Sequence, residues 1–596
     1  MESGQDAGTA ADRPPKFLLF LALIVAASFA IRVAAWSHWR TGAIESEGAE
    51  YARLAENLRN GIGFVGLVTP GPQLNFNPLF PLLIAGGSFL THGDFELAGR
   101  LVGLIMGSLL PLPVFGTASR LFDRRVGLIA ALLVLLHPLL VHLSFTVFSE
   151  GPYLTLFLFA VYLSVRALEQ PSLRNWLLVG AAFAFAWLVR AEALLGFAVA
   201  MMFALLVAPG DLLTRCKRTL AAVAAFLLLI SPEAIFVYRA TGKLKLEGKS
   251  TIFLYDAQRI LAAEHHPGQE YTSPGGHHEI PTPEPNVESA LRWEEKWAFF
   301  GIDSHLKGMG FALRPHVEIL REARMNPGDL PRIIAAGMRQ NLPILFQRLS
   351  SDWLGAPLLP ALAFLGVFRR SWQAKQARVR WFVLLIMAAP MVATFTSLRT
   401  EQRYYFVFIP LLSIFAANGL VGVGLWFKAS AAVLRWPLLA RPLSGVLVSG
   451  AVGLAMLLAA VSGRGNVYNF AESAPSTQVD KEIGHWLGQR QNYPIKVMDL
   501  SIPLAYHAGA QLFSYFPYCS NDSALQYADA AQVDYIVLRR EAHFTRYYQD
   551  WVERGISDSR AELLQLPAIP GAGKFIVYRW HRIDSPGNSH NNAGAH

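Results

Sequence analysis

The chain has 596 residues, of which 53% are hydrophobic and only 16% are charged, and its mean hydropathy is +0.33. Soluble domains usually carry about 25% charged residues, so this composition indicates an integral membrane protein. It excludes disordered, collagen-like, coiled-coil and disulfide-rich secreted classes. The net charge of +9 does not predict a nucleic-acid partner, because the lysines and arginines gather in short loops between apolar segments.

Eleven segments are apolar enough to cross roughly 30 Å of hydrocarbon, for which about 17 to 25 residues are needed. We expect them at 17–36, 97–121, 126–144, 150–168, 174–190, 193–208, 219–238, 354–368, 381–398, 404–427 and 443–461. The first follows Arg13 and Lys16 like a signal peptide, but its length and the segments behind it predict a retained helix. The shorter stretch Asn77 to Leu90 is broken by prolines and by a Gly-Gly pair, which predicts an interfacial or re-entrant segment.

The orientation follows from the loop charges. Sixteen lysines and arginines lie in the loops on one side, and three lie in the short loops on the other side. The positive-inside rule therefore predicts a cytoplasmic N-terminus and three outer regions, at 38–96, 239–353 and 462–596. Cys216 and Cys519 would then lie on opposite faces, so no disulfide is expected.

The outer regions differ in pattern. Residues 462–583 predict a soluble α/β domain, with helices at 479–490, 522–531 and 543–554 and strands at 495–500, 512–516, 533–539 and 575–580. This domain has no phosphate-binding glycine loop, so we expect it to cover the active site or to bind acceptor without catalytic groups. Residues 584–596 predict a disordered tail. Residues 249–285, rich in Pro, Gly and His, predict a loop that becomes ordered when a substrate binds.

The histidine pairs at 265–266 and 277–278 lie in this loop without a helix to fix them. They therefore predict no metal site. The sequence requires no cofactor, although a divalent cation remains an open alternative.

The first outer loop predicts a helix that begins near Glu47 and ends before Gly61. Tyr51 opens its apolar stripe, and Glu47, one turn earlier, heads the stripe, whereas Glu45 and Glu50 fall outside it. An inward-facing acid is therefore expected at Glu47. The alternative is that the three glutamates only favour the helix N-terminus and keep the loop hydrated.

Two polar clusters lie at the outer ends of predicted membrane segments. Ser149 and Glu150 begin the fourth segment, and Glu150 is expected to face a polar cavity or His142, because an acid that faces lipid would be destabilising. Arg190 and Glu192 lie where the fifth and sixth segments meet. Their alternative role is a local ion pair that holds a helical hairpin.

A third cluster, Arg399, Arg403 and Tyr404, lies at the start of the tenth segment, where the alternative is an interfacial aromatic anchor. Arg32 and Arg100 also map to outer ends of segments. Together these residues predict one outward-facing polar cavity. Its acids would act on a hydroxyl group, and its guanidinium groups would bind a phosphate leaving group.

Taken in chain order, the motifs of this sequence resemble those of the superfamily of protein O-mannosyltransferases and lipid A aminoarabinose transferases, which have the type C glycosyltransferase fold. The matching pieces are the acid-x-x-x-Tyr of Glu47 and Tyr51, the proline-rich segment from Asn77 to Pro81, Ser149 with Glu150, Arg190 to Glu192, and Arg403 and Tyr404 with Pro410. The chain departs from the family in three places: Glu47 stands where Asp is commoner, Ala191 replaces Pro, and Asn77 stands where the aminoarabinose branch tends to carry Lys.

We therefore expect a polytopic α-helical membrane protein with about 11 transmembrane helices in residues 1–461, type C glycosyltransferase architecture and a C-terminal soluble α/β periplasmic domain. The resemblance implies an inverting transferase that moves a sugar from a polyprenyl-phosphate donor to a glycolipid, polysaccharide or protein acceptor. The implied location is the outer face of a bacterial inner membrane. Two alternatives stay open: a lipid-linked-sugar flippase or transporter, and a non-catalytic glycan-assembly scaffold.

The expected roles of the site residues fall into three groups. The acids expected to be catalytic are Glu47, as the base, and Glu150. The groups expected to bind the donor phosphate are Arg32, Arg100, Arg190, Lys249, Arg399, Arg403 and Tyr404. The groups expected to position substrates are Tyr51, Asn77, His142 and Glu192.

Overall fold

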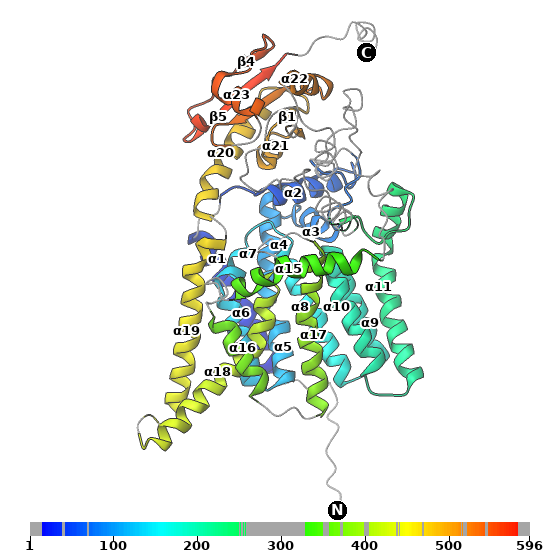
Figure 1. The fold of residues 1–596 in the computed structure, drawn as a ribbon, viewed down its shortest axis with the longest axis vertical. Coiled ribbons are helices and arrows are strands. Elements are labelled where there is room, and N and C mark those ends of the chain that lie inside the picture. Colours follow the sequence, from blue (N-terminus) through cyan, green and yellow to red (C-terminus); the bar gives the residue numbers. More distant parts are fainter. Residues whose placement is uncertain are drawn as a thin grey trace, which may run out of the picture.

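The computed structural model describes residues 15–38, 42–67, 71–249, 251, 254, 257, 328–349, 357–369, 374–397, 405–436, 439, 441–467, 470–513, 515, 521–542 and 546–581. In these ranges a bundle of α-helices forms the larger part of the protein, and an α/β unit lies at one end of the bundle (Figure 1). Two short helices, α2 (Ser46–Arg59) and α3 (Leu79–Gly87), lie between the bundle and this unit.

The remaining helices of this part run mostly along one direction, except α15 (Leu330–Leu349), which lies across the others (Figure 1). They are α1 (Pro15–His38), α4 (Phe95–Leu109), α5 (Pro111–Leu121), α6 (Arg124–Leu136), α7 (Pro138–Leu143), α8 (Glu150–Glu169), α9 (Leu173–Val189), α10 (Ala193–Leu206), α11 (Leu212–Thr241), α15 (Leu330–Leu349), α16 (Leu358–Phe368), α17 (Ala374–Ser397), α18 (Phe408–Val433) and α19 (Pro442–Val467).

Six helices in the described part of the chain are long and apolar enough to cross a membrane, judged by length and composition. They are Leu19–His38, Phe95–Leu121, Glu150–Glu169, Leu212–Thr241, Phe408–Val433 and Leu443–Val461. Three shorter apolar helices are Leu173–Val189, Ala193–Leu206 and Leu358–Phe368. A helical, multi-pass membrane protein was expected from the composition, and the helices agree with it, whereas the number eleven stays a prediction.

Two predicted segments differ from single helices because a proline interrupts each. The segment 126–144 breaks at His137, whose extended backbone (φ −66°, ψ 118°) precedes Pro138 and the six-residue helix α7. A proline lacks the N–H group and disfavours the helical conformation of the residue before it. In the segment 97–121, α4 and α5 meet at Leu110 and Pro111 but still form one continuous apolar span.

Helix α3 occupies the stretch that was interpreted as interfacial or re-entrant. It has nine residues. At 1.5 Å per residue it is about 13 Å long, less than half of the hydrocarbon thickness. It packs on α4, where a Cβ atom added to Gly87 would lie 3.6 Å from the Cβ atom of Ala98.

Helices of the bundle approach one another most closely where one of them presents a glycine. A Cβ atom at Gly180 of α9 would lie 2.1 Å from the carbonyl oxygen of Ala222 in α11. Likewise, a Cβ atom at Gly419 of α18 would lie 2.0 Å from the carbonyl oxygen of Leu362 in α16. Small residues at such crossings provide the van der Waals contact that holds membrane helices together. The crossings fix the helix ends that carry the polar clusters.

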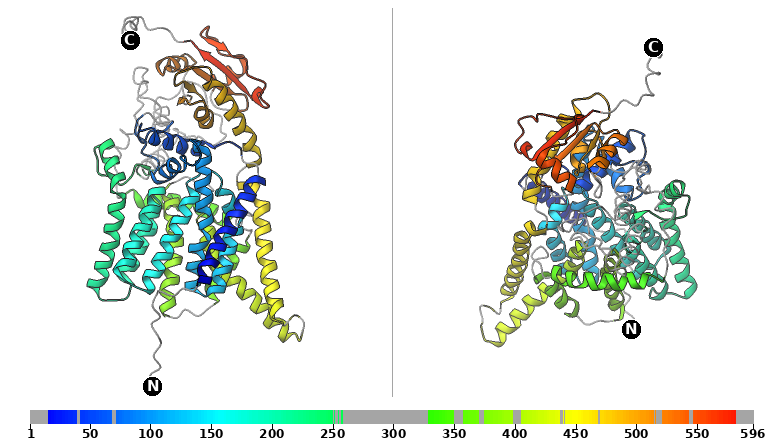
Figure 2. Two further views of the ribbon diagram at one scale, coloured as in Figure 1. Left: turned by 180° about the vertical axis from the view of Figure 1, so that it is seen from behind. Right: turned by 45° about the horizontal axis from the view of Figure 1, so that its top comes forward.

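The α/β unit contains a five-stranded sheet with the order β2-β1-β3-β5-β4. Strand β1 is parallel to β2 and β3, whereas β5 is antiparallel to β3 and β4. Figure 2 shows the sheet from two further directions. Its elements are α20 (Phe470–Gly488), β1 (Lys496–Met498), α21 (Ile502–His507), β2 (Gln511–Phe513), α22 (Asn521–Ala530), β3 (Tyr535–Arg539), α23 (Arg546–Arg554), β4 (Ala561–Leu563), η5 (Ala572–Lys574) and β5 (Phe575–Trp580).

Both faces of this sheet are covered by helices. Along β3, Tyr535 and Val537 pack with residues of α20 and α21, while Ile536 and Leu538 pack with residues of α22 and α23. This alternation is what a strand with two buried faces requires. All seven elements expected between residues 479 and 580 are present, whereas α21 and β4 were missed because they have only six and three residues.

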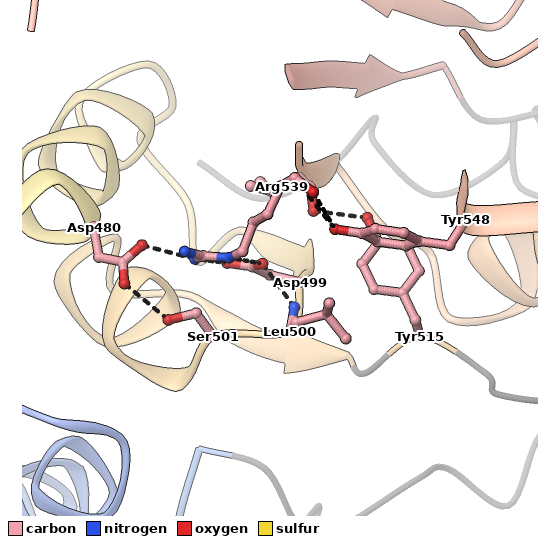
Figure 3. Close-up of polar contacts among 8 residues, drawn as sticks. Asp480, Asp499, Leu500, Ser501, Tyr515, Arg539 and Tyr548 are labelled. Carbon is pink, nitrogen blue, oxygen red and sulfur yellow. Dashed lines mark hydrogen bonds and ion pairs between the residues drawn. The ribbon is translucent and has the colours of Figure 1, made fainter. Parts of the chain in front are cut away.

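A half-buried arginine joins the elements on one face of the sheet (Figure 3). Arg539 donates from Nη2 to Asp480 Oδ1 at 2.7 Å, and from Nε and Nη2 to the two carboxylate oxygens of Asp499 at 3.1 and 2.9 Å. Ser501 donates to the other oxygen of Asp480 at 3.0 Å. The network ties α20 to β1 and β3, and it fixes α20, the element that leads back to the helical bundle.

The α/β unit contacts the helical part around the first predicted outer loop. Leu67 of this loop is 3% exposed and packs in the same apolar cluster as Ile483 and Leu504 of the unit. Arg53 of α2 donates to the carbonyl oxygen of Tyr506 at 3.4 Å. These contacts place α21 next to α2.

Candidate active site

Helix α2 carries the acid and the tyrosine singled out in the sequence. Its start packs closely on the segment that precedes α8, because a Cβ atom at Gly48 would lie 2.9 Å from the carbonyl oxygen of Val147. Glu47 is half-buried beside this contact, and Glu150 lies three residues after Val147. The helix predicted in this loop is therefore confirmed, and its first turn packs on the segment that leads to the second predicted acid.

Tyr51 lies at the centre of these groups. Its ring is 3% exposed and forms edge-on contacts with Phe76 and Phe80, each with 4.9 Å between ring centroids. Its hydroxyl group is hydrogen-bonded to the Ser149 side chain. Burial raises the pKa of Tyr51 well above its usual value, and the nearby charge of Arg190 opposes this shift. The tyrosine therefore stays protonated and links α2 to the start of α8.

Arg190 connects the two clusters that contain Ser149 with Glu150 and Arg190 with Glu192. Its Nη1 atom donates to Glu150 Oε1 at 2.7 Å and to Ser149 Oγ at 3.3 Å, and its Nη2 atom donates to Glu192 Oε1 at 3.0 Å. The side chain is 7% exposed and its guanidinium carbon lies 5.8 Å from the ring centroid of Tyr153. The local ion pair that was weighed for Arg190 and Glu192 is present, and Glu150 is its third member.

Lys249 is close enough to influence Glu192. Burial raises the pKa of Glu192, but the charges of Arg190 and Lys249 outweigh this effect and hold that pKa at about 2. Glu192 is therefore a carboxylate at neutral pH. Two acids and two basic side chains thus share one site at the end of the bundle that faces the α/β unit.

Asn77 also reaches the end of α9. Its buried side chain donates from Nδ2 to the carbonyl oxygen of Trp187 at 2.7 Å. Trp187 lies three residues before Arg190, so this bond joins the first predicted outer loop to the corner that presents the arginine. The contact favours a positioning role for Asn77.

Three other predicted site residues lie near this centre but bind protein groups. Arg32 of α1 donates to Ser28 Oγ at 2.6 Å and to Ser144 Oγ at 2.9 Å. Arg100 of α4 donates to backbone oxygens and to Glu96. His142 is buried, and its ring lies 4.9 Å from the ring of Phe145. These contacts hold neighbouring elements together, and the phosphate-binding role of the two arginines and the positioning role of His142 stay predictions.

Arg399, Arg403 and Tyr404 lie outside the described residues, as do the histidine pairs and nearly all of the expected gating loop after Lys249. The polar cavity expected around the acids stays a prediction. Within the described ranges, no group of three or more His, Cys, Asp or Glu side chains is arranged to hold a metal ion.

Glu50 differs from its predicted position. It was placed outside the inward stripe of α2, yet it is 2% exposed. Its carboxylate accepts hydrogen bonds from the Leu67 amide at 2.8 Å and from Gln73 Nε2 at 2.9 Å, so it closes the loop that follows α2. Gly66 is needed there because a Cβ atom would lie 1.8 Å from Glu50 Oε1. The periodicity of the helix could not reveal an acid that is buried by a loop.

Part of the chain matches a known protein family. Residues 72–236 match the sequence profile of the dolichyl-phosphate-mannose-protein mannosyltransferase family. This stretch contains Asn77, Glu150, Arg190 and Glu192, whereas Glu47 precedes it. The resemblance expected from the motifs is confirmed. Among curated proteins, no sequence matches the chain.

Solved structures share the fold. The archaeal oligosaccharyltransferase AglB from Archaeoglobus fulgidus, in complex with an inhibitory peptide and a dolichol-phosphate, is 13% identical, with 89% of this chain and 70% of that chain covered and a TM-score of 0.55. ArnT from Cupriavidus metallidurans, bound to undecaprenyl phosphate, is 13% identical, with 95% and 98% covered and a TM-score of 0.50. At these identities the likeness shows the fold, which is the type C architecture expected from the motifs.

Proposed function

We propose that the protein is an inverting glycosyltransferase that moves a sugar from a polyprenyl-phosphate donor to a glycolipid, polysaccharide or protein acceptor. The observation that carries this proposal is the meeting of α2, the start of α8 and the α9–α10 corner around Tyr51 and Arg190. Acids beside basic groups at one end of a membrane bundle suit attack by a hydroxyl group on a lipid-linked sugar. The family profile over residues 72–236 supports the same chemistry.

The reaction needs a base, because a sugar hydroxyl is a poor nucleophile until a carboxylate takes its proton. We assign the role of this base to Glu47. The acceptor oxygen forms a bond to the anomeric carbon from the face opposite the phosphate. The bond between that carbon and the phosphate oxygen breaks, and the electron pair leaves with the polyprenyl phosphate.

The other groups divide between positioning and charge. Arg190 holds Glu150 and Glu192, so that the two acids can orient hydroxyl groups of the substrates. Lys249, with Arg399, Arg403 and Tyr404 from the sequence motif, is assigned to the phosphate, whose charge grows as the bond breaks. Arg32 and Arg100 support the site through protein contacts.

The proposed topology has eleven membrane spans, a cytoplasmic N-terminus and the active site on the periplasmic side of a bacterial inner membrane. The excess of basic residues in the opposite loops supports it. Residues 1–461 then form the transmembrane domain, 462–583 the periplasmic α/β domain and 584–596 a disordered tail. The contacts of Arg53 and Leu67 with the α/β unit support the proposal that this domain covers the active site.

The test compares a deletion strain with its parent by mass spectrometry of lipid-linked sugars and envelope glycans. The expected result is accumulation of one lipid-linked sugar together with an acceptor that lacks this sugar. Complementation with Glu47→Gln should leave the defect, whereas the matched control Glu56→Gln, on the partly exposed side of the same helix, should restore the parental pattern.

The two alternatives predict other results. A flippase would leave the lipid-linked sugar on the inner side of the membrane, where a membrane-impermeant oxidant in intact spheroplasts could not reach it. A scaffold would be complemented fully by Glu47→Gln. Either result would overturn the proposed transferase.

A further inference from the structure

Arg100 joins the two chain segments that lead to the predicted acids. It donates from Nη1 to the carbonyl oxygen of Phe145 at 3.0 Å and from Nη2 to the carbonyl oxygen of Gly42 at 2.8 Å. Gly42 lies just before α2, which begins at Ser46 and carries Glu47. Phe145 lies five residues before Glu150, the first residue of α8. One planar guanidinium group therefore spans the approach to both acids.

The same segments meet in a tight steric contact. A Cβ atom at Gly48 of α2 would lie 2.9 Å from the carbonyl oxygen of Val147, and one at Gly99 of α4 would lie 2.6 Å from Val147 Cγ1. Val147 is thus wedged between α2 and α4, and Gly99, which it contacts, directly precedes Arg100 in the chain. Because this space is full, a shift of either segment must move the other.

Glu96 connects Arg100 to the α/β unit. Its Oε1 atom accepts from Arg100 Nη2 at 2.8 Å, and its Oε2 atom accepts from Lys481 Nζ of α20 at 3.0 Å. His507 of α21 lies beside it, with 4.0 Å between Nε2 and Oε2. The Glu96 side chain is 10% exposed, so its ion pair with buried Arg100 is largely shielded from water, whereas its partner Lys481 is partly exposed. The position of Arg100 thus depends on a group that the α/β unit supplies.

We propose that Arg100 is a positioning residue, and that docking of the α/β unit through Lys481 and Glu96 sets the relative position of Glu47 and Glu150. This inference rests on the proposed function, because it concerns the two acids of that site. The α/β unit then acts on turnover without contributing a group that touches the substrates. A guanidinium can serve two carbonyl oxygens and a carboxylate in one plane, which an ammonium group cannot do.

Steady-state transfer by the full-length protein in nanodiscs separates this role from binding of phosphate. Lys481→Gln should lower kcat about 10-fold while the KM for the polyprenyl-phosphate donor stays within about 2-fold, because misplacement of the acids affects only the transition state. Lys481→Arg should restore turnover. Arg100→Lys should lower kcat at least as far as Lys481→Gln. Lys574→Gln is the matched control, since it removes an exposed lysine–glutamate pair of the same unit, and it should behave as wild type.

A second measurement does not depend on transferase activity. Hydrogen exchange of the peptides that contain residues 42–50 and 144–150 should be faster in Lys481→Gln than in wild type and unchanged in Lys574→Gln. If the proposed function fails but this exchange pattern appears, the mechanical link stands without the transferase. Wild-type exchange and wild-type kcat in Lys481→Gln would overturn the inference. If Arg100→Lys instead raised the KM for the donor and left kcat unchanged, Arg100 would be assigned to binding of the donor phosphate, and the positioning role would be wrong.

Discussion

Arg190 Nη1 lies 2.7 Å from Glu150 Oε1, and both side chains are buried. The arginine lies at the end of α9 and the acid at the start of α8, so this bond fixes two helix ends that are 40 residues apart in the chain. Glu192 shares the same guanidinium at 3.0 Å. A buried arginine between two acids is stable only while every partner remains, because an unpaired charge in such a place is strongly destabilising.

Arg190→Leu should therefore destabilise the protein by about 3–5 kcal/mol, the usual effect of removing one member of a buried ion pair. The thermal unfolding midpoint in nanodiscs, followed by the fluorescence of the 14 tryptophans, measures this loss. Arg120→Leu is the control, because it removes the partly exposed partner of Glu169 and should cost only about 0–1 kcal/mol. Equal decreases in the two midpoints would contradict the prediction.

Glu47→Gln should lower single-turnover transfer by about 100 to 10,000-fold, the usual loss when a general base is removed, and should leave donor affinity nearly unchanged. The measurement uses purified protein, with donor binding determined in parallel. Glu56→Gln, a control on the same helix, should transfer at the wild-type rate. Near wild-type transfer by Glu47→Gln, with Glu150→Gln inactive but able to bind donor, would assign the base to Glu150 instead.

Gly48→Ala should reduce both stability and turnover, because its new methyl group would lie 2.9 Å from the carbonyl oxygen of Val147 and would push α2 away from α8. Overpacking of this kind typically destabilises by about 1–3 kcal/mol. The matched control is Gly86→Ala in α3, where a Cβ atom meets nothing within 4 Å, so stability should be unchanged or slightly higher. A decrease in the unfolding midpoint that is the same in both variants would show that the contact with Val147 is unimportant.

Much of this architecture was predictable because it depends on local patterns. Apolar length gives the membrane helices, and short runs of consecutive β-branched, aromatic and other apolar residues give β3 and β5. Helix α2 was predictable because its apolar stripe, which begins at Tyr51, ends before Gly61. The break at His137 was not predicted, although Pro138 is the residue that causes it.

The polar partners could be predicted only in part. Span ends that carry charges were expected to meet, and Glu150 and Arg190 do meet, although they are 40 residues apart. Nothing local indicates that Glu50 is buried by Leu67 and Gln73, or that Lys481 reaches Glu96 over 385 residues. Such contacts depend on how helices and the α/β unit dock, which no sequence period encodes.

The docking contact between α21 and the helical part should weaken as the pH falls. Burial lowers the pKa of His507 to about 4, although the charge of Glu96 opposes this shift. Lys481 and His485 also face the ring and disfavour its protonation. Once undocked, His507 would regain its usual pKa of about 6.5.

The sign follows from proton binding by the two states. Above about pH 6.5 the ring is neutral in both states, so docking is at full strength, whereas between about pH 6.5 and 4 only the undocked state binds a proton and docking loses free energy. His507 therefore dominates in the weakly acidic range.

The measurement is the distribution of distances between nitroxide labels at exposed Asn60 and Leu563, after both native cysteines are replaced by serine. In the wild-type background the distribution should broaden between about pH 7.5 and 5. His507→Asn should remove this change, because the amide fits a similar space and does not titrate in this range. A distribution that broadens equally in His507→Asn would assign the pH dependence to another group, and one that does not broaden in wild type would show that protonation of His507 leaves the docked state intact.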